Sequence, residues 1–201
     1  MTWIKTVEYD ESEGKLRTLY DRVKGPDNNV DNIMMAHSLR PHTMEGHMAI
    51  YKNVIHHSSN QVPKHTLEIL GVYVSLLNGC EYCVLHHFNG LKRLLNDDDR
   101  SQAIWDAFKN EAFEDTFDAK ELALLSYAKR LTQTPRAMEE SDIQSLREVG
   151  LEDGDILEIN QVVSYFSYAN RTVLGLGINT DGDILGLSPG DMDDADNWKH
   201  Q

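Results

Sequence analysis

The fold of this chain is decided by residues 63–95, which read PKHTLEILGVYVSLLNGCEYCVLHHFNGLKRLL. The stretch predicts a helix that starts after the proline and ends at Asn78-Gly79, a pair typical of helix ends. This helix is apolar on nearly all sides over residues 67–77, so we expect it to be central and buried. A second helix follows directly, from Cys80 or its neighbour. Together the two segments predict a helical hairpin at the centre of the protein.

The rest of the chain also has helical patterns and almost no strand patterns. Asp118 and Glu121, for example, have the spacing of a capping box at a helix start. The chain has 201 residues, which is enough for one domain with a sizeable core and too few to expect two. We therefore expect an all-α, single-domain bundle of eight or more helices over residues 1–180. The Gly-, Asp- and Pro-rich residues 181–201 are expected to form an irregular arm.

Charge and hydropathy exclude several classes of partner. The formal net charge is −14, which argues against nucleic acid and anionic membranes as partners. No apolar run reaches the ~18 residues that a membrane-spanning helix needs. The first residues, MTWIKTVEYDESEGK, lack the apolar region of a signal peptide. We therefore expect a cytoplasmic protein whose thiols are kept reduced.

The only two cysteines, Cys80 and Cys83, are followed by His86 and His87. A helix advances by ~100° per residue, which places Cys83 ~60° and His87 ~20° from Cys80. His86 falls ~120° away from that face, so His87 is the better partner for the thiols. Cys80 is expected in the first turn, where free N–H groups and the helix dipole favour a thiolate. The pattern is therefore typical of an activated, redox-active dithiol.

Two other interpretations of the cysteine motif stay open. Both cysteines could be inert core residues of an apolar helix. Cys80, Cys83 and His87 could instead bind zinc with a fourth ligand from elsewhere in the chain. Attachment of c-type haem is excluded, because it requires histidine at the position that Val84 occupies.

Glu68 is the one carboxylate in the apolar stretch LEILGVYVSLL. A buried carboxylate is costly unless it has a partner, although Glu68 could also face solvent in the first turn after Pro63. If the second helix folds back on the first, His87 comes near Glu68. A carboxylate that orients an imidazole beside a thiol is a common arrangement for activating a nucleophile.

Glu68, Cys80, Cys83 and His87 together form the motif E-x11-C-x-x-C-x-x-x-H. This motif resembles the alkylhydroperoxidase D branch of the carboxymuconolactone decarboxylase-like superfamily. The segment VSLLNGCEYCVLHH is especially similar to its peroxidase-related members, and the resemblance covers about residues 10–180. It implies an all-α fold that assembles into homo-oligomers, as trimers or hexamers.

The resemblance also implies a dithiol peroxidase that reduces a hydroperoxide without a bound cofactor and is regenerated by an external thiol or protein reductant. In the roles that it implies, Cys83 attacks the peroxide, Cys80 resolves the sulfenic acid, and His87 with Glu68 relays protons. The helix-terminus argument favours Cys80 as the attacking thiolate instead, so the two arguments disagree. The chain also departs from the family pattern, because Tyr82 stands between the cysteines where active peroxidases often have histidine.

Other polar and aromatic residues give weaker signals. Tyr51 and Tyr165 are expected to line a pocket or to belong to the core. Asn170 and Arg171 are expected at a helix end or an oligomer contact. Two helical segments, 64–77 and 155–174, are apolar on more than one face, which also favours a homo-oligomer. Surface or interface positions are expected for most of the histidines that precede the motif, namely His37, His42, His47, His56, His57 and His65.

Overall fold

Helices make up the regular structure of residues 2–190 and 197–201, which the computed structural model describes. The α-helices are α1 (Gly14–Val23), α2 (Asn32–Met35), α3 (Pro41–Ile55), α4 (Lys64–Leu77), α5 (Glu81–Leu95), α6 (Asp98–Asn110), α7 (Ala119–Gln133), α8 (Glu140–Glu148) and α9 (Asp153–Leu176). Three short 3-10 helices accompany them: η1 (Tyr9–Glu11), η2 (Pro26–Asn28) and η3 (Pro135–Ala137). The described residues contain no strand beyond an isolated bridge between Pro189 and His200. The all-α prediction is confirmed.

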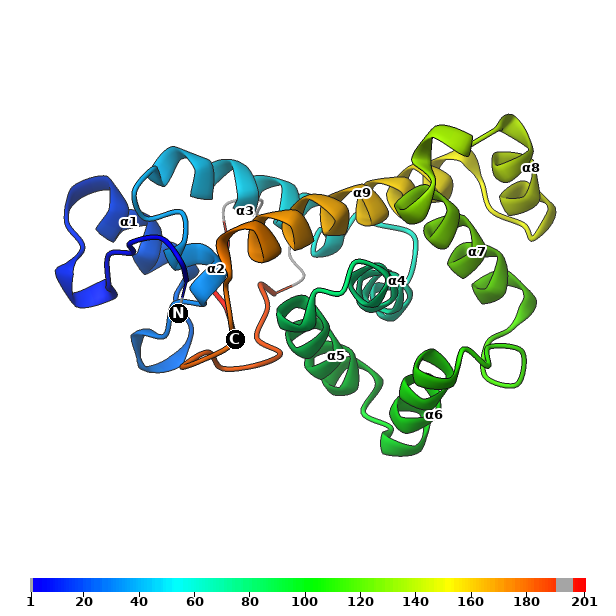
Figure 1. The fold of residues 1–201 in the computed structure, drawn as a ribbon, viewed down its shortest axis with the longest axis horizontal. Helices are drawn as coiled ribbons and strands as arrows, with labels where there is room; N and C mark the ends of the chain where they lie inside the picture. Colours follow the sequence, from blue (N-terminus) through cyan, green and yellow to red (C-terminus); the bar gives the residue numbers. More distant parts are fainter. Residues whose placement is uncertain (1, 191–196) are drawn as a thin grey trace.

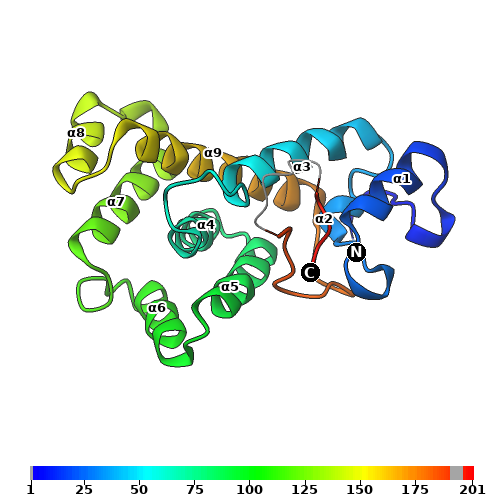
Figure 2. The ribbon, with the colours of Figure 1, turned by 180° about the vertical axis from the view of Figure 1, so that it is seen from behind.

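Helix α4 lies at the centre of the molecule, as its sequence predicts. Figures 1 and 2 show it end-on, surrounded by α5, α7 and the long helix α9. All residues from Thr66 to Ser75 are buried. A helix that is apolar on all sides is most stable when every side is removed from water. This is why the other helices pack around α4.

The turn between α4 and α5 sets the position of the cysteine motif. Gly79 has a φ of +68°, a left-handed conformation that glycine adopts without strain. The N–H of Cys80 then donates to the carbonyl of Ser75 at 2.9 Å, which caps the end of α4. Helix α5 begins at Glu81, so Cys80 is the N-cap residue and not, as expected, part of the first turn. Its carbonyl still accepts the first helical hydrogen bond, from Val84.

Local signals fix helix starts elsewhere. The Asp118 side chain accepts from the N–H of Glu121, and the Glu121 side chain accepts from the N–H of Asp118. The predicted capping box at the start of α7 is therefore confirmed. No helix in the described portion is long and apolar enough to cross a membrane.

After α9 the chain returns across α2 and α5, and its described residues 177–190 and 197–201 form no further helix (Figure 1). The Asn32 amide donates to the carbonyls of Asn179 and Asp181, and Arg93 donates to the carbonyl of Gly186. We call residues 178–190 and 197–201 the C-terminal segment. Residues 191–196 of the expected arm lie outside the described residues, and the division of the chain at residue 180 stays a prediction.

The packing of α4 against α9 predicts the effect of a single methyl group. A Cβ atom on Gly71 would lie 2.2 Å from the ring of Phe166, which is itself fully buried. We expect Gly71→Ala to lower the free energy of unfolding by about 1–3 kcal/mol through overpacking. Urea unfolding measures this. Gly46→Ala on α3 is the matched control, because its Cβ meets nothing within 4 Å. The control should gain up to about 1 kcal/mol, and equal effects of the two variants would contradict the packing argument.

Candidate active site

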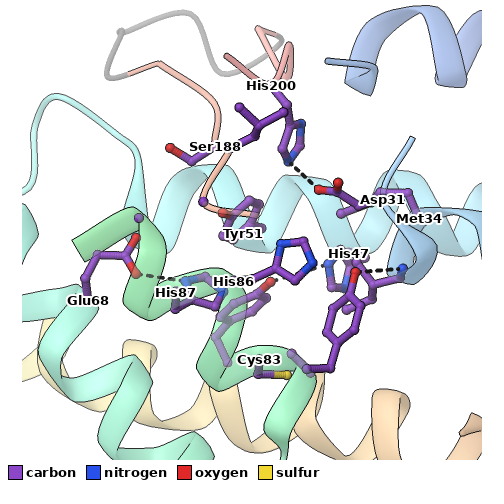
Figure 3. Close-up of a pocket in the computed structure, with 17 residues that line it drawn as sticks. Asp31, Met34, His47, Tyr51, Glu68, Cys83, His86, His87, Ser188 and His200 are labelled. Carbon is purple, nitrogen blue, oxygen red and sulfur yellow. Dashed lines mark hydrogen bonds and ion pairs between the residues drawn. The ribbon is translucent and has the colours of Figure 1, made fainter. Parts of the chain in front are cut away.

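A cavity of about 40 Å³ lies among α3, α4, α5, α9 and the C-terminal segment (Figure 3). Glu68, Cys83 and His87 line it, and Cys80 does not. A single water molecule occupies about 10–15 Å³ of cavity volume measured in this way. The cavity therefore suits a molecule of only a few heavy atoms. Three of the four predicted residues therefore line one cavity, and Cys80 does not.

The two thiols are in direct contact. Cys80 Sγ and Cys83 Sγ lie 2.7 Å apart, and both cysteines are free and buried. The hydrogen bond between the thiols lowers the pKa of Cys80, whereas burial raises the pKa of Cys83. A proton that leaves this pair is therefore lost more easily from Cys80.

Asn170 of α9 lies near the thiol pair but does not line the cavity. Its side-chain N–H donates to Ser75 Oγ at 3.0 Å, and its carbonyl oxygen accepts from Asn78 at 2.9 Å. Interaction with Asn170 also lowers the pKa of both cysteines, as a smaller effect. This fully buried amide thus satisfies the end of α4, one of the two expected roles. The neighbouring Arg171 is exposed and donates to the carbonyl of Ser167.

Glu68 and His87 form the predicted pair across the helical hairpin. His87 Nδ1 lies 2.8 Å from Glu68 Oε2, and the Glu68 residue is only 2% exposed. Burial raises the pKa of Glu68, but the charge and hydrogen bond of His87, together with the charges of His56 and Lys64, more than offset this, and the pKa is lowered overall. An ionised Glu68 only accepts hydrogen bonds, so Nδ1 of His87 carries a hydrogen. Nε2 of a neutral His87 is then free to accept a proton.

A second histidine–carboxylate pair lies beside the first and was not predicted. His86 lines the cavity, although its angle on the helix argued against it. Its Nε2 lies 3.0 Å from Asp183 Oδ2 of the C-terminal segment. The hydroxyl of Tyr82 donates to the same oxygen at 2.7 Å. No local sequence pattern places Asp183 here, because it is about a hundred residues away and outside any helix.

The aromatic wall of the cavity comes from α3 and α9. Tyr51 and Tyr165 both line the cavity and stack with ring centroids 5.5 Å apart. His47 lies beside them, with its Nε2 3.4 Å from the Tyr165 hydroxyl. The expectation of a surface position is wrong for His47 and for His56, which are both buried. It holds for His42 and His65, which are exposed.

The alternative of a metal site gains no support from the geometry. Within residues 2–190 and 197–201, no three His, Cys, Asp or Glu side chains are grouped so that they could hold a metal ion. Cys80, Cys83 and His87 lie close in sequence, but His87 is turned toward Glu68.

Comparison with known proteins places this site in a known fold. No protein-family model matches the chain, and no curated protein matches it. An uncharacterized peroxidase-related protein from Ralstonia eutropha JMP134, solved as an alkylhydroperoxidase AhpD core, has a TM-score of 0.75 over 92% of this chain and 96% of that chain, at 20% identity. The fold is that of the AhpD core.

Two further solved structures have this AhpD-like fold. A peroxidase-related protein from Silicibacter sp. TM1040 matches with a TM-score of 0.70 at 22% identity, over 90% of each chain. The debrominase Bmp8, solved as a cysteine-to-alanine variant with 2,3,4-tribromopyrrole, matches with a TM-score of 0.66 at 15% identity, over 89% of this chain and 90% of that chain. At these identities the likeness concerns the fold, which hosts more than one chemistry.

The burial of His47 predicts a pH dependence of stability. Burial lowers the pKa of His47 from 6.5 to about 3. Between these values the unfolded chain binds a proton that the folded protein does not, so His47 makes the protein less stable as the pH falls. His47→Gln should flatten this dependence by about 1.4 kcal/mol per pH unit between about pH 6 and 4.

Guanidinium unfolding at several pH values in this window measures the two slopes. Asp31, whose pKa burial raises to about 7, and His200, whose pKa burial lowers to about 4, also titrate there. Both are present in each protein, so the difference between the slopes isolates His47. Parallel slopes for the two proteins would show that His47 is protonated in the folded state.

Proposed function

We propose that this protein is a thiol-dependent peroxidase, which reduces a small hydroperoxide through Cys80 and Cys83. The observation that carries the proposal is that Cys83 and the Glu68–His87 pair line one cavity, while the Cys83 sulfur contacts Cys80. A nucleophile, a base and a resolving thiol are then all within one site.

Access to the cavity supports Cys83 as the attacking residue. Cys80 has no exposed surface and does not line the cavity, whereas Cys83 does. The pKa directions favour Cys80 as the thiolate, but a thiolate that cannot touch the peroxide cannot attack it. His87, whose Nε2 is free, is the base that would remove the Cys83 proton at the moment of attack.

The proposed reaction balances with two thiols and one external reductant. The Cys83 thiolate attacks the terminal oxygen of the hydroperoxide, the O–O bond breaks, and the alkoxide takes up a proton to leave as an alcohol. Cys83 is then a sulfenic acid. Cys80 attacks the Cys83 sulfur, the hydroxyl leaves with a proton as water, and a disulfide forms. An external thiol or protein reductant restores the dithiol, and no bound cofactor takes part.

Reductive debromination of a small aromatic ring is the second candidate. Its support is the structural similarity to the debrominase Bmp8 and the aromatic wall of Tyr51 and Tyr165. The same dithiol would replace bromine by hydrogen and release bromide as it forms the disulfide. The volume of about 40 Å³ favours a small hydroperoxide, which has fewer and smaller atoms than a tribrominated ring. Bromide release from 2,3,4-tribromopyrrole by the reduced protein, without peroxide consumption, would favour this candidate.

Substitution of each cysteine tests the peroxidase. Cys83→Ser should abolish hydroperoxide consumption, because it removes the attacking sulfur. Cys80→Ser should give a single stoichiometric turnover that ends in a sulfenic acid on Cys83. Thiol titration with one equivalent of hydroperoxide measures both, and the unsubstituted protein should lose two thiols and gain an internal disulfide. A single turnover retained in Cys83→Ser and lost in Cys80→Ser would reverse the two roles.

We also propose that the protein is a homo-oligomer in a reducing compartment such as the cytoplasm, where its dithiol is regenerated. Helix α9 exposes the large apolar side chains of Leu157, Tyr168 and Leu174, which an interface between copies would cover. Light scattering at micromolar concentration should give the mass of a trimer or a hexamer of the 22.9 kDa chain. A monomer at that concentration would overturn the proposal.

A further inference from the structure

Two histidine–carboxylate pairs lie at one cavity, but the reaction above uses only one of them. His86 and His87 both line the cavity with Cys83. Glu68 holds His87 from α4, and Asp183 holds His86 from the C-terminal segment. Figure 3 shows His86 and His87 next to each other above Cys83. The question is what the second pair does.

The surroundings of Asp183 are those of an ionised acceptor. Its carboxylate accepts from the Tyr82 hydroxyl at 2.7 Å and from the N–H of Asn32 at 3.0 Å. The Tyr82 oxygen in turn accepts from the N–H of Ile33 at 3.2 Å, so its own hydrogen must point to Asp183. The Asp183 side chain is 1% exposed. A carboxylate with these donors holds the Nε2–H of His86 and provides the counter-charge for its imidazolium form.

The position of His86 leaves one ring nitrogen for chemistry. Its Nε2 is engaged by Asp183, which does not itself line the cavity. The Nδ1 is therefore the nitrogen available to a molecule in the cavity. The proposed peroxide reaction needs a proton at two places: His87 removes one from Cys83, and the oxygen that leaves must gain one. A single imidazole that serves the sulfur does not also serve the far end of the O–O bond at the same instant.

We propose that His86 is a second acid–base residue, which donates a proton to the oxygen that leaves when Cys83 attacks a hydroperoxide. Asp183 and Tyr82 are positioning residues that hold its ring. This inference rests on the proposed peroxidase function.

The protons balance over the full reaction. The Cys83 proton passes to His87, and the His86 proton passes to the alkoxide, which leaves as an alcohol. When Cys80 attacks the sulfenic acid, His87 returns its proton to the leaving hydroxyl, which forms water. The proton released by Cys80 restores His86 through solvent, so both histidines return to their initial states.

Two oxidants of similar size separate this role from a structural one. Ethyl hydroperoxide expels ethoxide, a strong base that needs a proton as it leaves. Peracetic acid expels acetate, which needs none. We expect His86→Gln to slow oxidation by ethyl hydroperoxide about 100-fold or more, the usual size of a general-acid contribution, and to change the rate with peracetic acid less than about threefold. Rapid-mixing measurement of thiol loss gives both rates.

Glu68→Gln is the matched comparison at the other pair. It should slow both oxidants alike, because each of them needs a deprotonated Cys83. Asp183→Asn keeps the shape of the carboxylate but not its charge, so it should show the selectivity of His86→Gln in weaker form. Asp183→Asn therefore tests the same role if His86→Gln folds poorly, which circular dichroism would reveal.

The outcomes are distinct. Equal slowing of both oxidants in folded His86→Gln, or no slowing of either, would overturn the role of His86 and leave the peroxidase proposal in place. Failure of the unsubstituted protein to react with either oxidant would overturn the peroxidase proposal itself, and the role of His86 with it.

Discussion

The structure depends on a charge placed where charge is most costly. Glu68 lies in α4, the helix against which α5, α7 and α9 pack, and it is almost completely buried. His87 makes this tolerable, and in doing so it fixes the rotation of α5 against α4. Removing one partner of a buried pair typically costs about 3–5 kcal/mol. The same rotation turns Cys83 toward the cavity and Cys80 away from it, so the pairing that stabilises the hairpin also arranges the site.

The two thiols differ in a way that suits the proposed order of reaction. The contact with Cys83 favours the thiolate of Cys80, while burial disfavours that of Cys83. These pKa directions are unfavourable for the attack of Cys83 on a peroxide, so His87 must remove the Cys83 proton. For the second step it is favourable, because the residue that must attack the sulfenic acid is the more acidic thiol and already touches the sulfur. Acidity and access are thus divided between neighbouring cysteines.

Sequence reasoning predicted what local patterns determine. The hairpin, the capping box at Asp118 and the proximity of Glu68 to His87 all follow from spacing within one or two helices. It failed for His86, because a helical angle describes one face and this cavity extends around α5 to the C-terminal segment. Asp183 could not be found at all, since its place depends on a turn after α9 that brings it to Tyr82 from 101 positions away. The predicted surface position of His47 was wrong, because a histidine among both polar and apolar neighbours in the sequence gives no sign of burial.

The 101 positions between Tyr82 and Asp183 affect the order in which the site forms during synthesis. Translation proceeds at about 5–20 residues per second, so Tyr82 and His86 leave the ribosome roughly 5–20 s before Asp183 follows them. During this interval the helix with both cysteines can form its hairpin with α4, but the cavity has no C-terminal cover and His86 has no carboxylate. A nascent chain therefore carries an accessible dithiol before it carries a finished site. The cavity wall that Cys83 lines is therefore completed only when the C-terminal segment folds back over α5.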